Sequence, residues 1–135
     1  MWMILQANKP DDWVIATGKT TSVREFIKLA FKYVEVDIEF SGKGVEEKGV
    51  VSKSSNKNFK FKVGQEVIKV DPKYFRPSEV DILVGDASKA KKELGWEPKI
   101  SLEELIDDMM ESDLKLMSKE VALKDIGFKP KNYFE

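Results

Sequence analysis

The residues best suited to chemistry lie in the segment Arg76-Pro77-Ser78-Glu79. Pro77 pushes the residue before it towards extended geometry, so a turn here would hold a guanidinium and a carboxylate on one side of a bend. That arrangement suits a phosphorylated sugar, because arginine binds phosphate with a two-pronged fork and a carboxylate accepts hydrogen bonds from vicinal hydroxyls. The alternative is a local ion pair between Arg76 and Glu79, worth less than about 1 kcal/mol on an exposed surface. The residues alone leave both alternatives open.

Paired carboxylates are the next candidates, and they occur as Glu46-Glu47, Glu103-Glu104 and Asp107-Asp108. Catalytic pairs converge on a cleft from different environments. The last two pairs fall in a predicted helix, where adjacent side chains point in different directions, so we expect them to face solvent. Glu46 and Glu47 lie near a predicted turn, and a role for one of them stays open.

Glycines and lysines give weaker signals. The sequence contains neither Gly-x-Gly-x-x-Gly nor Gly-Lys-Ser/Thr, so a dinucleotide loop and a P-loop are not expected in it. Lysines alternate with Phe59 and Phe61, which superficially resembles a base-stacking surface. A strand with one packed and one solvated face explains the alternation more simply, and we favour that interpretation.

Composition excludes several classes of protein. The 135 residues, 41% hydrophobic and 35% charged, fit one compact domain. The absence of histidine and cysteine argues against a Ser-His-Asp triad, a thiol nucleophile and a metal site. A net charge of -1 disfavours nucleic-acid binding. No apolar run reaches the ~20 residues of a membrane span, and no signal peptide is recognisable, so we expect no membrane association and a cytoplasmic location.

The first half of the chain predicts both helices and strands. Helices are expected at residues 1–6 and 22–34, and strands at 13–17, 36–40 and 45–53. The run before Gly18 is continuously apolar, which is typical of a buried parallel strand. Ser22 and Glu25 have the spacing of a helix capping box. The strand at 36–40 alternates apolar and acidic residues, as a half-buried strand does.

The second half predicts further strands, then two helices. Strands are expected at 59–63, 67–70 and 80–84, a turn at 74–79, and helices at 86–94 and 101–118. Asp86 and Ser101 are predicted caps, Glu104 completes a second capping box, and Gly95 ends the first of these helices. The apolar face of the last helix comprises Leu102, Leu105, Ile106, Met109, Met110, Leu114 and Met117. Beyond Lys119 the sequence suggests a loosely attached tail.

Six segments in this order resemble one family. They are Trp13-Val-Ile-Ala-Thr-Gly18, Ser22-Val-Arg-Glu-Phe26, Gly44-Val-Glu-Glu-Lys-Gly49, Asp71-Pro-Lys-Tyr-Phe-Arg-Pro-Ser-Glu-Val80, Gly85-Asp-Ala-Ser-Lys-Ala90 and Leu94-Gly-Trp-Glu-Pro98. Together they are similar to the C-terminal part of GDP-mannose 4,6-dehydratase, an extended short-chain dehydrogenase/reductase. The resemblance covers residues 1 to about 118.

The resemblance implies a mixed α+β fold, the substrate-binding C-terminal part of such an enzyme without most of its Rossmann sheet. Residues 1–20 would be a remnant of the Rossmann-side helix and last strand, 21–118 the substrate-binding domain, and 119–135 a C-terminal tail.

The same resemblance implies a reaction that this chain lacks the residues to perform. The family converts GDP-mannose to GDP-4-keto-6-deoxymannose with NADP, using a glycine-rich loop and a Tyr-x-x-x-Lys motif. Here Tyr33 is followed four residues later by Asp37, and Tyr74 by Ser78. We therefore expect no catalytic and no cofactor-binding residue in this chain, no activity from it alone, and NADP only in the full-length enzyme.

Three residues take binding roles by this resemblance. In related sugar-nucleotide enzymes the Arg-Pro-x-Glu turn binds the nucleotide. The resemblance therefore implies that Arg76 binds the diphosphate and that Glu79 binds the ribose hydroxyls. Arg24 lies in the first turn of a predicted helix, whose N-terminus favours anions, so it is a candidate for phosphate or substrate. The alternative for Arg24 is a structural tie between that helix and a neighbouring loop.

The expected partner is GDP-mannose or a related nucleotide sugar. Two other assignments stay open, a non-enzymatic nucleotide-sugar binding module and one half of a split dehydratase completed by a separate Rossmann subunit. Self-association is also expected, because the apolar strand at 13–17 would expose an edge that pairs with another copy. A remnant without function is the remaining alternative.

Overall fold

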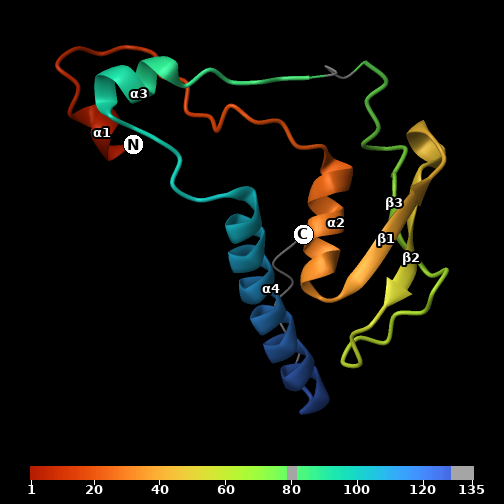
Figure 1. Ribbon diagram of the computed structural model, residues 1–135. Coiled ribbons are helices and arrows are strands. Elements are labelled where there is room, and N and C mark those ends of the chain that lie inside the picture. The colour runs from red at the N-terminus through yellow and green to blue at the C-terminus, as the bar shows by residue number, and fades with distance from the viewer. Residues whose placement is uncertain (79–81, 129–135) are drawn as a thin grey trace.

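A computed structural model describes residues 1–78 and 82–128, which form a mixed α+β fold (Figure 1). The elements are α1 (Trp2–Leu5), α2 (Val23–Tyr33), β1 (Val36–Ser41), the 3-10 helix η1 (Gly44–Glu46), β2 (Lys48–Ser54), β3 (Glu66–Lys69), α3 (Ser88–Leu94) and α4 (Leu102–Asp125). Helix α2 contacts both β1 and α4 and lies between α4 and the sheet (Figure 1). Residues 1–20 and 82–100, which include α1 and α3, form an arm that extends from this body (Figure 1). The predicted mixed α+β class is confirmed.

The sheet is antiparallel, with strand order β1-β2-β3. Gly49 on the middle strand is paired with Phe40 on β1 and with Ile68 on β3. A Cβ at this glycine would lie 3.1 Å from side-chain atoms of Ile38, Phe40 and Ile68. Carbon atoms pack best at about 3.5–4.0 Å, so any larger residue would push the neighbouring side chains apart. The middle strand therefore needs glycine at this position.

The core lies between α2, α4 and the first two strands. Its buried residues are Val34, Val36, Ile38 and Val51. Partly buried side chains pack around them, namely Phe31, Phe40, Phe59, Phe61, Val67, Met110 and Leu114. Along β1 the valine and isoleucine are buried while Asp37 and Glu39 are exposed, so the predicted half-buried strand is confirmed.

The strand predicted at residues 59–63 is wrong, although its alternation of exposure holds. Phe59 and Phe61 are half-buried against the core, and the intervening lysines are exposed. The backbone instead turns at Gly64, whose N–H donates to the Val51 carbonyl at 2.8 Å, and leads into β3. Because β3 pairs with the free edge of β2, residues 59–63 form no strand there. They contribute only their aromatic rings to the core. The strand predicted at 67–70 is confirmed, one residue earlier.

The buried parallel strand predicted at residues 13–17 is also wrong. The segment runs beside residues 82–86: a Cβ at Gly85 would lie 2.5 Å from Cβ of Ala16. The Thr20 hydroxyl donates to the Leu83 carbonyl at 3.0 Å. Neither residues 13–17 nor residues 82–86 form a β-ladder, and Val14 remains 51% exposed. A buried parallel strand needs a neighbouring strand on both sides, and the described residues supply one neighbouring segment. Residues 80 and 81 of the strand predicted at 80–84 lie outside the described part.

Both serine caps are confirmed. The Ser22 hydroxyl accepts from the Glu25 N–H at 3.1 Å at the start of α2. At the start of α4, Ser101 accepts from the Glu104 N–H at 3.2 Å, and the Glu104 carboxylate accepts from the Ser101 N–H at 2.7 Å. These bonds satisfy backbone donors that have no partner within the helix.

Helix α3 differs slightly from its prediction. Its N-cap is Ala87, and Asp86, one residue earlier, accepts from the Ser88 N–H at 2.9 Å. The carboxylate thus still satisfies a free donor at the helix start. Gly95 ends the helix at φ +66°, in the left-handed region that glycine tolerates, as expected.

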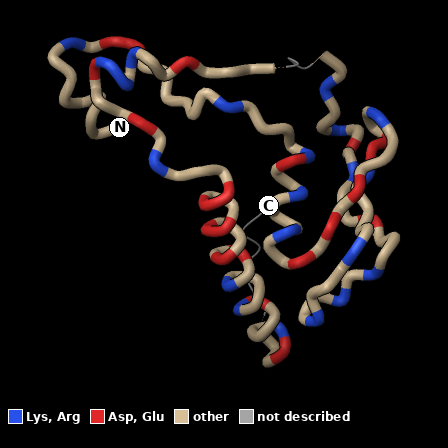
Figure 2. Tube along the Cα trace, in the orientation of Figure 1, with Lys and Arg blue, Asp and Glu red and all other residues tan. Residues whose placement is uncertain are grey.

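Helix α4 is longer than predicted and continues to Asp125, past the start of the expected tail at Lys119. Residues 129–135 of that tail lie outside the described part. Ile106 is the buried member of the predicted apolar face. Acidic residues lie along the first half of the helix (Figure 2). The exposed members of that face are Leu105, Met109 and Met117. None of the helices described is long and apolar enough to cross a bilayer.

The packing of α4 predicts different costs for two neighbouring truncations. Ile106 is 2% exposed and Leu105 is 44% exposed. Ile106→Ala should lower the free energy of unfolding by about 2–5 kcal/mol, since it removes buried atoms and leaves a cavity. Leu105→Ala, the matched control, should cost about 1 kcal/mol or less. Urea unfolding followed by circular dichroism measures both. Equal losses would show that α4 packs in another rotation.

Candidate functional site

Arg76 lies directly after a compact turn that follows β3. The Asp71 carbonyl accepts from the Tyr74 N–H at 3.0 Å, and the Asp71 carboxylate accepts from the Lys73 N–H at 2.8 Å. Asp71 therefore closes the turn with both its backbone and its side chain. Arg76 follows this turn and is exposed.

The turn is attached to the loop that precedes β2. The Val70 N–H donates to the Glu47 carbonyl at 3.3 Å, one residue beyond the end of β3. The Phe75 ring lies against Gly44: its nearest atoms are 3.5 and 3.8 Å from where a Cβ of that glycine would stand. Residues 44–47 thus contact the chain on both sides of the turn, and the second contact involves the residue next to Arg76.

Glu79, the predicted partner of Arg76, lies outside the described residues. Its predicted role in binding ribose therefore stays a prediction.

Arg24 binds Glu47. Its Nε and one terminal nitrogen donate to the two carboxylate oxygens of Glu47, the latter bond at 2.8 Å. This is the two-pronged geometry that a guanidinium forms with a carboxylate. The pair joins the first turn of α2 to the loop between η1 and β2, the structural tie that was the alternative role for Arg24. Glu47 was left open among the paired carboxylates, and its spacing from Arg24 gave no signal of the contact.

The ion pair changes the titration of both groups. The hydrogen bonds from Arg24 lower the pKa of Glu47 below its ordinary 4.5, against the opposing effect of burial. The hydrogen bonds to Glu47 raise the pKa of Arg24. The Glu47 side chain is 16% exposed and that of Arg24 is 59% exposed, so the arginine still reaches solvent. Two of its five N–H donors are used in the pair.

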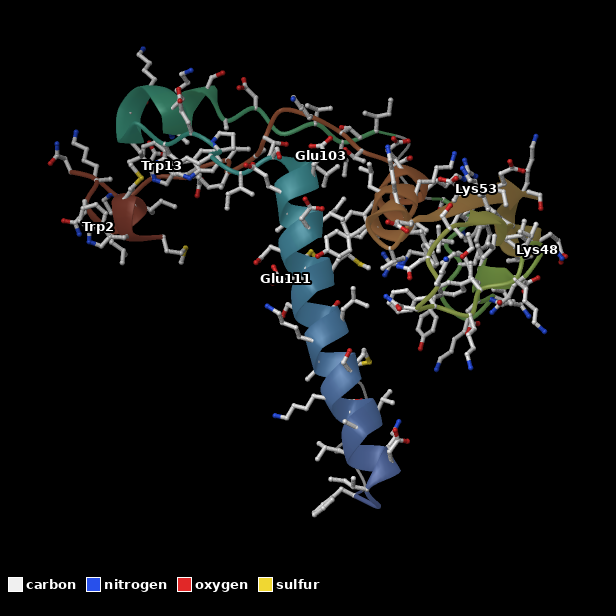
Figure 3. All side chains as sticks on the ribbon, turned by 60° about the horizontal axis from the view of Figure 1, so that its bottom comes forward. Trp2, Trp13, Lys48, Lys53, Glu103 and Glu111 are labelled. Atoms are coloured by element: carbon white, nitrogen blue, oxygen red, sulfur yellow. The ribbon has the colours of Figure 1, made fainter. Side chains whose placement is uncertain are left out.

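A second cluster of polar contacts holds the arm together. Lys89 on α3 pairs with the Asp11 carboxylate at 2.7 Å and donates to the Asp12 carbonyl at 3.0 Å. Its ammonium also lies 4.8 Å from the centre of the Trp13 ring, a cation–π contact that places this ring beside α3 (Figure 3). These contacts organise the arm, and none involves Arg24 or Arg76.

Three hollows of the described surface lie on this arm. One of about 440 Å³ lies between α1, Trp13 and the end of α3. Another of about 420 Å³ is lined by residues 16–18, 85–88 and 96–98, which come from three of the segments that carry the family resemblance. Arg24 and Arg76 line neither. Among residues 1–78 and 82–128, no group of three or more acidic side chains is placed to hold a metal ion.

Comparison with known proteins identifies the family of this chain. The sequence model of the family described as GDP-mannose 4,6 dehydratase matches residues 1–109. The chain belongs to this family.

Its relatives share close to half of its residues. The chain is 47% identical over 128 residues to a GDP-mannose 4,6-dehydratase of Yersinia enterocolitica, with 94% of this chain and 34% of the relative aligned. It is 50% identical over 119 residues to a GDP-mannose 4,6 dehydratase of Drosophila melanogaster, with 88% of this chain and 28% of the relative aligned. The chain thus spans about a third of the length of these relatives.

The Arg24–Glu47 pair predicts a pH-dependent stability. Because folding lowers the pKa of Glu47, the pair stabilises the fold above the ordinary pKa of 4.5 and is lost as pH falls through the lower, folded pKa. Glu47→Gln should therefore lower Tm at about pH 7, and this deficit should shrink as pH falls from about 4.5 towards about 3. Thermal unfolding across this range measures the difference.

Glu46→Gln is the matched control, since Glu46 is exposed and adjacent. It should change Tm little at either pH. A Glu47→Gln deficit that persists undiminished at the acid end, or none at neutral pH, would contradict the prediction.

Proposed function

We propose that this chain is the nucleotide-sugar-binding, C-terminal part of a GDP-mannose 4,6-dehydratase, and that Arg76 binds the diphosphate of GDP-mannose. The family match supports the substrate class. The observation that carries the site is the position of Arg76, exposed after a hydrogen-bonded turn whose two ends are held by residues 44–47. Residues 21–118 would be the binding domain, with the arm at 1–20 facing the rest of the enzyme.

The chemistry of binding follows from the side chains. Arg76 would donate two parallel N–H bonds to phosphate oxygens, with a geometry that a lysine cannot reproduce. Glu79 would accept from the ribose hydroxyls. Arg24 already donates two hydrogen bonds to Glu47. We therefore propose that it supports the loop and does not contact the substrate directly.

The described residues do not fit NADP. A dinucleotide cradle needs a strand, a glycine-rich turn and a helix in immediate succession. Among the described glycines at positive φ, Gly18 lies closest before an α-helix, and no strand is assigned before it. We derive no hydride step for this chain and propose that it is inactive alone, and that NADP and the reacting groups belong to the remainder of the full-length enzyme.

A split enzyme is the second candidate, and exposed apolar side chains on the arm fit it as well as they fit the remainder of a single full-length chain. Trp2 and Leu5 are 72% and 77% exposed on α1, and Ile82 and Leu83 are 69% and 77% exposed beside the 13–17 segment. Apolar surface of this kind marks a contact site when it is contiguous. A separate Rossmann subunit would cover it and complete the enzyme, whereas a binding module alone would leave it free.

Replacement of Arg76 tests the binding proposal. Arg76→Lys keeps the charge but removes the fork, and a charge-assisted hydrogen bond is worth about 1.5–3 kcal/mol, so the affinity for GDP-mannose should fall at least about tenfold. Glu79→Gln should cost less, since an amide oxygen still accepts one bond. Isothermal titration of the chain with GDP-mannose gives Kd for each variant.

Lys73→Ala is the matched control, because it removes a cation from the same turn without touching the fork. Its effect on Kd should be smaller than that of Arg76→Lys. If Arg76→Lys leaves Kd unchanged and lowers Tm, Arg76 is a structural tie and the proposal is wrong.

A further inference from the structure

We infer that the loop Gly44–Glu47 and the Phe75 ring form a positioning device that holds Arg76 ready for a diphosphate before the ligand arrives. This inference rests on the proposed function of Arg76. It adds positioning residues that do not touch the ligand, and it follows from a continuous series of contacts between the first turn of α2 and the residue before Arg76.

The first contact fixes the loop to the helix. Both carboxylate oxygens of Glu47 accept from the Arg24 guanidinium. Two parallel bonds oppose rotation of the carboxylate more strongly than a single bond does. The last residue of the loop is therefore held relative to α2, which itself packs on β1 and α4.

The loop itself has a fixed shape. Gly42 has φ +85°, and a Cβ there would lie 2.2 Å from the Glu46 carbonyl oxygen, a distance that no side chain tolerates. Gly44 has φ +57°, also in the left-handed region. The two glycines allow η1 to fold tightly against the start of β2, so the loop presents one surface to the Phe75 ring.

The second and third contacts fix the turn to the loop. The Glu47 carbonyl accepts from the Val70 N–H at 3.3 Å before the turn, and Gly44 meets the Phe75 ring after it. Phe75 is 41% exposed, so part of its side chain is covered and part is open to solvent. The turn is thereby attached at both ends to the same loop.

Arg76 is consequently restrained from both sides. Its predecessor is packed on Gly44, and its successor Pro77 restricts the backbone of Arg76 to extended geometry. Restraint of a binding group before association reduces the conformational entropy lost on binding. The device should therefore raise affinity without any contact of its own to the ligand.

Two glycine substitutions separate this role from simple destabilisation. Gly42 and Gly64 have closely similar positive φ, +85° and +83°, so alanine strains the backbone at either position. A Cβ at Gly42 would lie 2.2 Å from the Glu46 carbonyl oxygen and would displace the loop, whereas a Cβ at Gly64 would have nothing within 4 Å. Gly42→Ala should weaken the binding of GDP roughly three- to tenfold in isothermal titration, and Gly64→Ala should leave Kd unchanged while lowering Tm.

The aromatic ring gives an independent arm of the test. Phe75→Leu should weaken GDP binding as Gly42→Ala does, and Phe75→Tyr should retain the affinity because the ring is kept. Equal Kd for Gly42→Ala and Gly64→Ala, or for Phe75→Leu and the unsubstituted chain, would overturn the inference.

A measurement without ligand distinguishes failure of the inference from failure of the proposed function. Heteronuclear NOE of the Arg76 backbone N–H signal reports the restraint of its backbone directly. Gly42→Ala and Phe75→Leu should lower that NOE, and Gly64→Ala should not. An unchanged NOE overturns the positioning device, even if Arg76→Lys weakens GDP binding. A lowered NOE together with an Arg76→Lys variant of unchanged Kd would instead keep the device and overturn the diphosphate role.

Discussion

The ion pair between Arg24 and Glu47 joins two parts of the molecule that the chain itself keeps apart. The residues are 23 positions from one another, one on the first turn of α2 and one on the loop that enters β2. Exposed ion pairs usually contribute little to stability. This one differs because its geometry is bidentate and the carboxylate is largely covered. The position of the η1 loop, and through it the turn that carries Arg76, depends on this contact.

The sheet and helices supply the rigid support that the ion pair needs. Gly49 leaves room for side chains of β1 and β3 to pack over β2, and the buried valines of β1 and β2 pack with α2 and α4 into one core. The arm is held by separate contacts around Lys89, so it is organised independently of the loop. Under the proposed function, ligand binding and contact with the rest of the enzyme would use different ends of this chain. The chain aligns with about a third of the length of its relatives.

Local signals in the sequence were sufficient to predict the helices, and non-local pairing limited the strands. Ser22, Ser101 and Gly95 act within a few residues of themselves, and the structure confirms each as a helix terminus. The segments at 13–17 and 59–63 have the composition of strands, but a strand also needs a neighbour with a free edge. Phe59 and Phe61 instead add their rings to the core.

The candidate site shows the same division. The turn predicted at 74–79 from Pro77 differs from the observed one, because Asp71 closes a hydrogen-bonded turn at 71–74 and Arg76 follows it. Arg24 was proposed from its place in the first turn of a predicted helix, which the structure confirms as α2. No local feature of the sequence indicates that Glu47 is the partner of Arg24, because their contact depends on how α2 packs against the sheet. The contact between Phe75 and Gly44 is equally non-local and was not predicted.

The two arginines permit one direct test of the central claim, that Arg76 binds the ligand while Arg24 supports the loop. The chain should give two Nε–Hε signals in a ¹H–¹⁵N spectrum, one for each arginine. On titration with GDP, the Arg76 signal should move and saturate with the same Kd as calorimetry, and the Arg24 signal should stay at its Glu47-bound position. Movement of the Arg24 signal with a stationary Arg76 signal would contradict the account.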